Sequence, residues 1–280
     1  MFSFEDKVIP LDSWITAFID WLVEGYRWFF QIIKWPVEVT LTGIEQGITA
    51  LPPLLVIAVL AIVAWRVSGI KLGVFTFVTL VFIGLLGLWE DTMVTLAMVL
   101  CSVVFCTIAG IPLGILAGRN DRFEMALRPV LDAMQTTPAF VYLVPIVMLF
   151  SIGNVAGVLA TIVFALPPII RLTSLGIRQV HPELVEAALA FGATNWQVLT
   201  KVQIPLALPT IMAGLNQTIM MALSMVVIAS LIGAGGLGAP VVLGLNTLDI
   251  GLATIGGLAI VLIAIVLDRI TQSMGTKKQN

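Results

Sequence analysis

The stretch that decides how this chain is organised is EAALAFGATNWQVLTKVQIP, residues 186–205, a polar segment inside a very apolar sequence. Long hydrophobic runs lie on both sides of it. Of the 280 residues, 59% are hydrophobic and only 11% are charged. This composition excludes an ordinary water-soluble globule and indicates an integral membrane protein. Function should therefore be sought in the polar segment.

Local signals within this segment predict two short helices at an angle. Pro182 can occupy the first turn of one helix, and Gly192 can adopt the left-handed conformation that ends it. Thr194 or Asn195 can cap the second helix, and Pro205 is expected to stop it.

The first of these helices has two different faces. Leu184, Ala187, Ala188 and Phe191 fall on one side, which leaves Glu183 and Glu186 available to a partner. Such a projection suits a mechanical contact with another protein. The alternative is a re-entrant or surface connection that has no partner.

Apolar runs elsewhere predict a polytopic helix bundle, because about 20 helical residues cross a hydrocarbon core. The run at 138–152 is short and carries Pro138 and Pro145, which makes it the least regular. Several runs contain glycine or proline, as is common in helix bundles that move. The seven stretches are 51–66, 70–88, 92–118, 138–152, 154–175, 210–232 and 252–268.

Residues 11–35 predict an amphipathic helix with polar groups on one face. Trp14, Trp21, Trp28 and Trp35 recur every seven positions along the border of that face. Tryptophan favours the water–lipid boundary, so this helix is expected to lie in the membrane interface. The alternative is an ordinary helix docked on the rest of the protein. Pro36 is expected to end it, followed by a mixed segment to about residue 50.

Basic residues predict the orientation. With seven spans and an outer N-terminus, the outer loops near Glu90, Asn154 and 233–251 contain no lysine or arginine. This asymmetry favours an outer N-terminus, a cytoplasmic C-terminus and a cytoplasmic segment 186–205. The outer basic residues would all lie in the N-terminal region, at Lys7, Arg27 and Lys34. The inner basic residues would be Arg66, Lys71, Arg119, Arg122, Arg128, Arg171, Arg178, Lys201, Arg269, Lys277 and Lys278.

Several other functions are not supported by the sequence. The net charge of −2 and the lack of a basic stripe argue against nucleic-acid binding. His181 has no neighbouring histidine or cysteine for a metal site, and no hydrolytic set is apparent. Cys101 and Cys106 are five apart on one predicted helix, so we expect packing residues and no disulfide between them.

The sequence does not support nucleotide binding by this chain. Residues 233–238, GAGGLG, match the dinucleotide pattern G-x-G-x-x-G, but they follow a membrane helix where that motif requires a strand. We expect an outer turn or gate formed by Gly233, Gly235, Gly236 and Gly238. The phosphate-binding pattern G-x-x-x-x-G-K-[ST] is absent, so ATP would have to bind to another chain.

The polar segment resembles the EAA loop of ABC-importer permeases. Glu186, Ala187 and Ala188 are followed by three residues, Gly192, nine residues and VQIP, where the family pattern ends I-x-L-P; Val202 and Ile204 are conservative departures. Nearly the whole chain is similar to permeases of ProU-type glycine betaine/proline betaine importers. The segments that carry this resemblance are IPLDSW near the start, 131–154 (LDAMQTTPAFVYLVPIVMLFSIGN), 164–173 (FALPPIIRLT) and 209–238 (PTIMAGLNQTIMMALSMVVIASLIGAGGLG).

The resemblance implies an all-α, multi-pass bacterial inner-membrane protein with about seven spans, a MetI-like core and an N-terminal interfacial helix. The implied divisions are an extracytoplasmic region (1–50), two accessory helices (51–90), a permease core (91–270) with its EAA loop at 178–209, and a cytoplasmic tail (271–280).

The same resemblance implies partners. Two permease copies would form the pathway, two cytoplasmic ATPase subunits would bind the loop, and an extracytoplasmic binding protein would deliver substrate. The permease would hold no cofactor or metal and would have no catalytic residue. The ATPase-coupling residues would be Glu186, Ala187, Ala188, Gly192, Ile204 and Pro205.

Polar residues within spans are pathway candidates, because polar groups in lipid normally face protein or water. Hydrogen bonding between helices is the alternative for each. Aromatic faces suit the cation of a betaine. The pathway candidates are Gln135, Thr137, Phe140, Tyr142, Asn216, Gln217 and Ser224.

The predicted function is import of glycine betaine or a related osmolyte by alternating access. The close alternative is the same machinery carrying choline, carnitine, proline or another methylated amine. An alternative of a different class is a membrane channel or receptor that does not pump. The EAA loop favours the importer.

Overall fold

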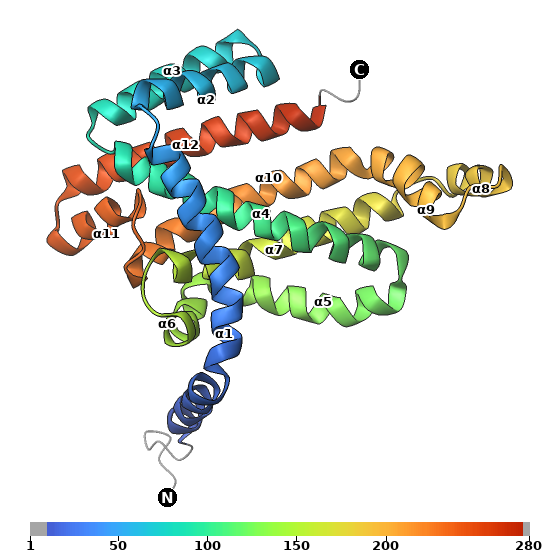
Figure 1. Cartoon of the computed structure of the whole chain (residues 1–280), viewed down its shortest axis with the longest axis horizontal. Helices are drawn as coiled ribbons and strands as arrows, with labels where there is room; N and C mark the ends of the chain where they lie inside the picture. Colours follow the sequence, from blue (N-terminus) through green and yellow to red (C-terminus); the bar gives the residue numbers. More distant parts are fainter. Residues whose placement is uncertain (1–9, 277–280) are drawn as a thin grey trace, which may run out of the picture.

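The computed structural model describes residues 10–276, and every regular element among them is helical (Figure 1). This agrees with the predicted all-α bundle. The main helices are α1 (Leu11–Thr49), α2 (Pro53–Ser68), α3 (Ile70–Leu85), α4 (Trp89–Arg119), α5 (Asp121–Thr136), α6 (Leu143–Phe150), α7 (Asn154–Arg178), α8 (Pro182–Ala190), α9 (Asn195–Val198), α10 (Ile204–Ala229), α11 (Gly238–Thr247) and α12 (Ile250–Thr276). Lys7, Lys277, Lys278 and the end of the predicted tail lie outside the described residues.

The centre of the fold is a three-helix unit of α4, α7 and α10. Gly110, Gly114 and Gly118 line one side of α4 and meet α7 at close range. A Cβ on Gly114 would lie 2.5 Å from Thr173 Cβ. On α7, a Cβ on Gly176 would lie 3.1 Å from Ala207 Cβ of α10. Small residues let the helix backbones approach closely, so this unit is held together by van der Waals contacts between complementary surfaces.

Helix α5 is attached in another way. It runs beside the unit (Figure 1), but Leu131 is its one buried residue within the helix. Asn120 caps its start by accepting hydrogen bonds from the backbone N–H groups of Arg122 and Phe123. Its far end bends by 102° into the segment Ala139–Phe150. The path of the chain therefore turns at both ends of α5.

Helix α1 differs from its prediction, because Pro36 does not end it. The helix continues to Thr49, and its non-helical residue is Tyr26. Beyond Pro36, Val37 and Leu41 are buried in the main core. An interior proline costs about 3 kcal/mol, which this packing offsets. The prediction of a mixed segment from residue 36 was therefore wrong.

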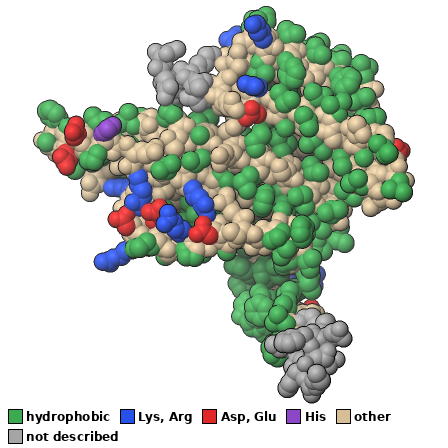
Figure 2. Space-filling model, turned by 180° about the vertical axis from the view of Figure 1, so that it is seen from behind, with side chains coloured by type: hydrophobic (Ala, Val, Ile, Leu, Met, Phe, Trp, Pro, Cys, Tyr) green, Lys and Arg blue, Asp and Glu red, His purple; other side chains and the backbone are tan. Residues whose placement is uncertain are grey.

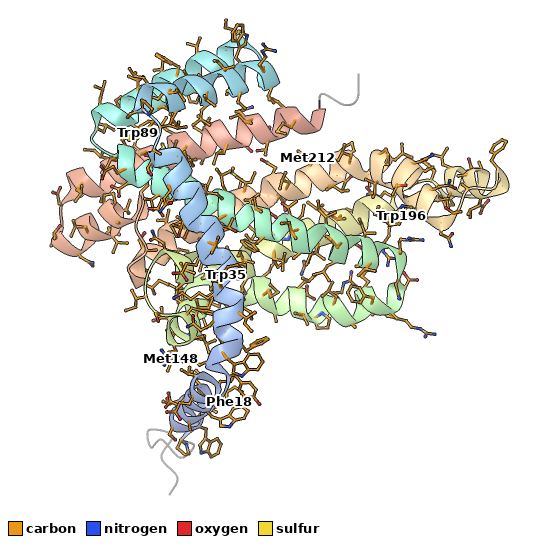
Figure 3. All side chains as sticks on the ribbon, viewed as in Figure 1. Phe18, Trp35, Trp89, Met148, Trp196 and Met212 are labelled. Atoms are coloured by element: carbon orange, nitrogen blue, oxygen red, sulfur yellow. The ribbon has the colours of Figure 1, made fainter. Side chains whose placement is uncertain are left out.

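The N-terminal part of α1 extends beyond the bundle, and Phe18 lies on this extension (Figure 3). The four tryptophans at 14, 21, 28 and 35 are all exposed. Figure 1 shows α1 crossing the long helices of the bundle at a steep angle. This arrangement fits a helix that lies along the membrane surface, and the interfacial placement remains a prediction.

Within residues 10–276, four helical segments are long and apolar enough to cross a membrane: α4, α7, Asn195–Ile232 and Ile250–Met274 of α12. The number rises to six if each of two bent pairs forms one span, compared with about seven predicted. The stretch 138–152 is the irregular one, because it forms a 3₁₀ turn (Ala139–Tyr142) and the eight-residue α6. Cys101 and Cys106 are fully buried free thiols, as expected for packing residues.

Candidate functional site

The polar segment folds into a projecting arm, which we define as residues 182–203. Helix α8 ends where Gly192 adopts φ +82°. The N–H of Gly192 donates to the Leu189 carbonyl at 2.9 Å, and the N–H of Ala193 donates to the Ala188 carbonyl at 3.0 Å. These two bonds form a Schellman motif. The predicted role of Gly192 in ending the helix is confirmed.

Thr194 begins the second helix of the arm with a capping box. Its hydroxyl accepts from the Gln197 N–H at 3.3 Å, and its own N–H donates to Gln197 Oε1 at 2.8 Å. The reciprocal bonds satisfy two backbone donors at a helix start. Glycine and the cap together hold α8 and α9 in a defined turn.

Pro205 does not stop this second helix, contrary to the prediction. Helix α9 continues through a π-helical turn, Leu199–Gln203, directly into α10. The N–H of Ile204 donates to Leu199, five residues back. Pro205 then occupies the first turn of α10, where a missing N–H is tolerated. The arm is therefore joined to a core helix without a loop.

The arm exposes apolar as well as acidic side chains. Helix α8 has no buried residue, and Glu183 and Glu186 are exposed. Phe191 at the turn is 92% exposed and Trp196 is 69% exposed. The predicted apolar side of α8 is thus largely available, since Leu184, Ala187 and Phe191 are exposed and Ala188 is half-buried. Figure 3 shows Trp196 on the arm, far from the extension of α1.

A cluster of ion pairs lies at the base of the arm, and sequence reasoning missed it. Arg178 ends α7 and contacts Asp121 Oδ1 at 2.6 Å and Glu124 Oε2 at 2.9 Å on α5. Arg171, two turns earlier on α7, contacts Asp132 Oδ1 at 2.5 Å. The partners are 39 to 57 positions apart in sequence, so no local pattern indicates the pairing.

These charged side chains surround a hollow beside the arm (Figure 2). The hollow is a cavity of about 260 Å³ between α4, α5 and α7. Its lining residues are Ala117, Glu124, Leu127, Arg128, Leu131, Ile170, Arg171, Ser174, Leu175 and Arg178.

The pathway candidates on α10 separate into two groups. Gln217 and Ser224 are exposed and lie two turns apart on the same face. Asn216 instead donates to Asp268 Oδ1 of α12 at 3.0 Å and accepts from the Thr271 hydroxyl at 2.8 Å. Asn216 therefore joins two helices, which was the alternative considered for each polar residue.

The candidates near α6 are also divided. Phe140 is exposed, and Gln135 and Thr137 are half-buried. The Tyr142 hydroxyl donates to the Met134 carbonyl at 2.6 Å. Tyr142 thus fastens the bend between α5 and the following segment, and its hydroxyl is used internally.

The glycine run 233–238 lies against the first turns of α4 and α7. The N–H of Gly235 donates to Asn154 Oδ1 at 2.7 Å, and the N–H of Leu237 donates to Thr95 Oγ1 at 2.8 Å. Gly233 and Gly236 have positive φ, and a Cβ on Gly238 would lie 2.3 Å from Ser230 Oγ. The run is thus tightly held at the end of the bundle opposite the arm. Its role as an outer gate remains a prediction.

Within residues 10–276, no group of three or more His, Cys, Asp or Glu side chains could hold a metal ion. His181 immediately precedes α8 and is exposed. The candidate site consists of the projecting arm, with its exposed side chains, and the ion pairs at its base.

A bundle of long apolar helices with a projecting arm is the architecture of a multi-pass membrane protein. The chain belongs to the family of binding-protein-dependent transport system inner membrane components, whose profile matches residues 110–277. This confirms the resemblance carried by the EAA loop. The chain is accordingly a multi-pass inner-membrane permease component.

Named relatives agree over nearly the whole chain. It is 57% identical over 272 residues to the glycine betaine/proline betaine transport system permease protein ProW of Escherichia coli K12, covering 97% of this chain and 77% of ProW. It is 45% identical over 272 residues to the glycine betaine transport system permease protein OpuAB of Bacillus subtilis 168, covering 97% of this chain and 96% of OpuAB.

A third relative and a solved structure extend this similarity. The chain is 46% identical over 276 residues to the glycine betaine/carnitine transport permease protein GbuB of Listeria monocytogenes, covering 97% of this chain and 98% of GbuB. An inward-facing structure of the MetNI methionine ABC transporter is similar to this chain, with 28% sequence identity and a TM-score of 0.55. The match covers 65% of this chain and 90% of the solved chain. The predicted MetI-like architecture is thereby confirmed.

Proposed function

We propose that this chain is the permease subunit of an ABC importer for glycine betaine, proline betaine and related osmolytes. The relatives named for these compounds support the substrate class. The projecting arm is the observation that carries the mechanism, since it offers an exposed surface continuous with a core helix. ATP binding on a partner would favour one state of a bistable bundle. Alternation between the two states would then move the substrate inward.

The proposed assembly contains two copies of this chain, two cytoplasmic ATPase subunits and one extracytoplasmic binding protein. The arm and the C-terminus would be cytoplasmic and the N-terminus outside. Arg119 and Arg178 support this orientation, because they end parallel helices on the side of the arm. Glu90 and Asp91 begin α4 at the opposite end, and basic residues favour the cytoplasmic side.

The ATPase would bind the arm through the exposed turn. Phe191 offers a large apolar side chain beside exposed carboxylates, and aromatic anchors dominate the affinity of many interfaces. The remaining coupling candidates serve the turn in different ways: Glu186 and Ala187 lie on the exposed surface, Ala188 accepts a turn hydrogen bond, and Ile204 and Pro205 begin α10.

Phe191→Ala tests this docking surface. We expect at least about tenfold weaker ATPase binding, a loss of roughly 1.4 kcal/mol or more. The control is Phe77→Ala, the same change at an exposed position on α3. Affinity is measured between detergent-solubilised permease and its ATPase. Equal affinities for the two variants would contradict docking at Phe191.

The substrate would cross between the two copies, along the exposed face of α10 that carries Gln217 and Ser224. Exposed polar groups on a membrane helix require cover by protein or by a water-filled passage. Phe140 would add an aromatic face for a quaternary ammonium group. The glycine run 233–238 would close the outer end of this passage.

Uptake competition tests the substrate class. The complete transporter is reconstituted in vesicles, and entry of labelled glycine betaine is measured against unlabelled proline betaine, proline, choline and carnitine. We expect ATP-dependent accumulation that betaines reduce most. Stronger competition by choline or carnitine would reassign the substrate, and carnitine is tested because a relative is named for it. Passive equilibration without ATP would instead indicate a channel.

A further inference from the structure

We propose that Arg178 is a positioning residue that transmits displacement of the projecting arm to helix α5. This inference rests on the importer function proposed above. Arg178 is the last residue of α7, and α8 begins only four residues later. A force applied to the arm therefore reaches Arg178 through a very short connection.

The guanidinium of Arg178 joins three helices. Its Nη1 atom lies 2.6 Å from Asp121 Oδ1, in the first turn of α5. Its Nη2 atom lies 2.9 Å from Glu124 Oε2 and donates to the Ala117 carbonyl of α4 at 2.6 Å. The side chain thus contacts both sides of the turn that connects α4 to α5.

Arginine is suited to this position, because its planar fork holds several acceptors in fixed relative directions. Lysine would offer a single compact charge on a flexible stem and could not keep all three contacts. The pairs are partly exposed, with side-chain exposures of 31% for Arg178 and 80% for Asp121. Such pairs contribute little to stability, so the contribution of Arg178 is mainly geometric.

Helix α5 is the element most able to respond. It has one buried residue, a turn of the chain at each end and a cavity of about 260 Å³ between it and helices α4 and α7. Arg171 and Asp132 form a second attachment, two turns before Arg178 on α7. Displacement of the Arg178 end would therefore tilt α5 about this second attachment, while the closely packed α4 and α7 stay together.

Arg178→Gln tests the proposal in the complete reconstituted transporter, and Arg122→Gln is the matched control. Arg122 lies beside Asp121 in the first turn of α5, and its substitution removes the same charge, but its side chain forms no ion pair with another residue of 10–276. The measured quantity is the amount of glycine betaine imported per ATP hydrolysed. We expect Arg178→Gln to lower this ratio about five- to tenfold, within the usual range of coupling energies, and Arg122→Gln to leave it unchanged.

A purely structural role would reduce the amount of assembled transporter and leave the ratio of import to hydrolysis intact. Arg178→Lys keeps the positive charge but loses the planar fork, so it should recover part of the ratio. If Arg178→Gln does not assemble, the ratio of import to hydrolysis is measured in the double variant Asp121→Asn with Glu124→Gln. This variant removes both ion pairs and leaves the hydrogen bond from Arg178 to the Ala117 carbonyl in place.

An unchanged ratio in the variant that assembles would overturn the role of Arg178. That result is distinguishable from failure of the proposed function, in which the wild-type transporter itself shows no ATP-dependent import.

Discussion

The three-helix unit and helix α5 are held by different forces. In the unit, glycines on α4 and α7 bring backbones into close contact, and displacement of one helix would open voids or create clashes. Helix α5 buries only Leu131 and is joined to α7 by ion pairs between partly exposed side chains. Shape-based packing favours one arrangement, whereas ion pairs between partly exposed side chains can exchange partners at low cost. The comparison predicts a rigid unit beside a movable helix.

The largest effect is expected when the contact between α4 and α7 is broken. In Gly114→Val, the added carbons would overlap Thr173 and the Ile170 carbonyl, so the helices must separate. Overpacking typically costs about 1–3 kcal/mol. Thermal unfolding in detergent measures the loss. Gly257→Val is the control, because no atom lies within 4 Å of a Cβ at that position; equal unfolding temperatures would contradict close packing.

A similar but smaller effect is expected where the glycine run is fastened to α4. Thr95→Val leaves the buried N–H of Leu237 without its acceptor, which typically costs about 1–3 kcal/mol. Thr107→Val removes a hydroxyl that bonds only within α4. The difference in unfolding temperature between the two variants isolates the bond to the loop. If they unfold together, this bond does not stabilise the outer end.

The turn of the arm should affect transport more than global stability. Gly192→Val places a β-branched residue at φ +82°, a strain of about 1–2 kcal/mol. Gly69→Val creates a similar strain at φ +95°, away from the arm, and both sites have room for a Cβ. We expect Gly192→Val alone to lower betaine import and substrate-stimulated ATP hydrolysis. Normal hydrolysis in that variant would contradict coupling through the arm.

The smallest effect on stability is expected at the ion pairs of α5. Arg171→Gln removes the contact with Asp132, and both side chains are about half exposed. Exposed pairs contribute about 0–1 kcal/mol, so the unfolding temperature should fall far less than in Gly114→Val. Adding salt should reduce even this difference by screening the charges. A loss as large as that of Gly114→Val would remove the distinction between the two regions.

The contrast also explains what could be predicted from sequence. The arm depends on neighbours in the chain: Gly192 ends one helix and Thr194 caps the next, so local rules were sufficient. The predictions that Pro36 and Pro205 end helices were wrong, because Pro36 is tolerated through packing on the core and Pro205 follows a π-helical turn. Neither condition is visible in a local pattern.

The site beyond the arm depends on contacts between distant positions. Asn216 could be recognised as an unusual polar residue in a membrane helix, but its partners Asp268 and Thr271 are more than 50 positions away. The pairing of Arg178 with Asp121 is equally remote. Composition indicated that such residues need partners, and only the packing of the helices identifies which ones.

The most direct test of a rigid unit beside a movable α5 is a pair of distances in the complete transporter. Spin labels are placed at exposed Leu206 of α10 with either Met125 of α5 or Leu116 of α4, after alanine replaces the two buried cysteines. Pulsed electron paramagnetic resonance then compares the nucleotide-free and ATP-trapped states. We predict that the distance from 206 to 125 changes while the distance from 206 to 116 stays constant. A constant distance to 125, or equal changes in both, would contradict the account.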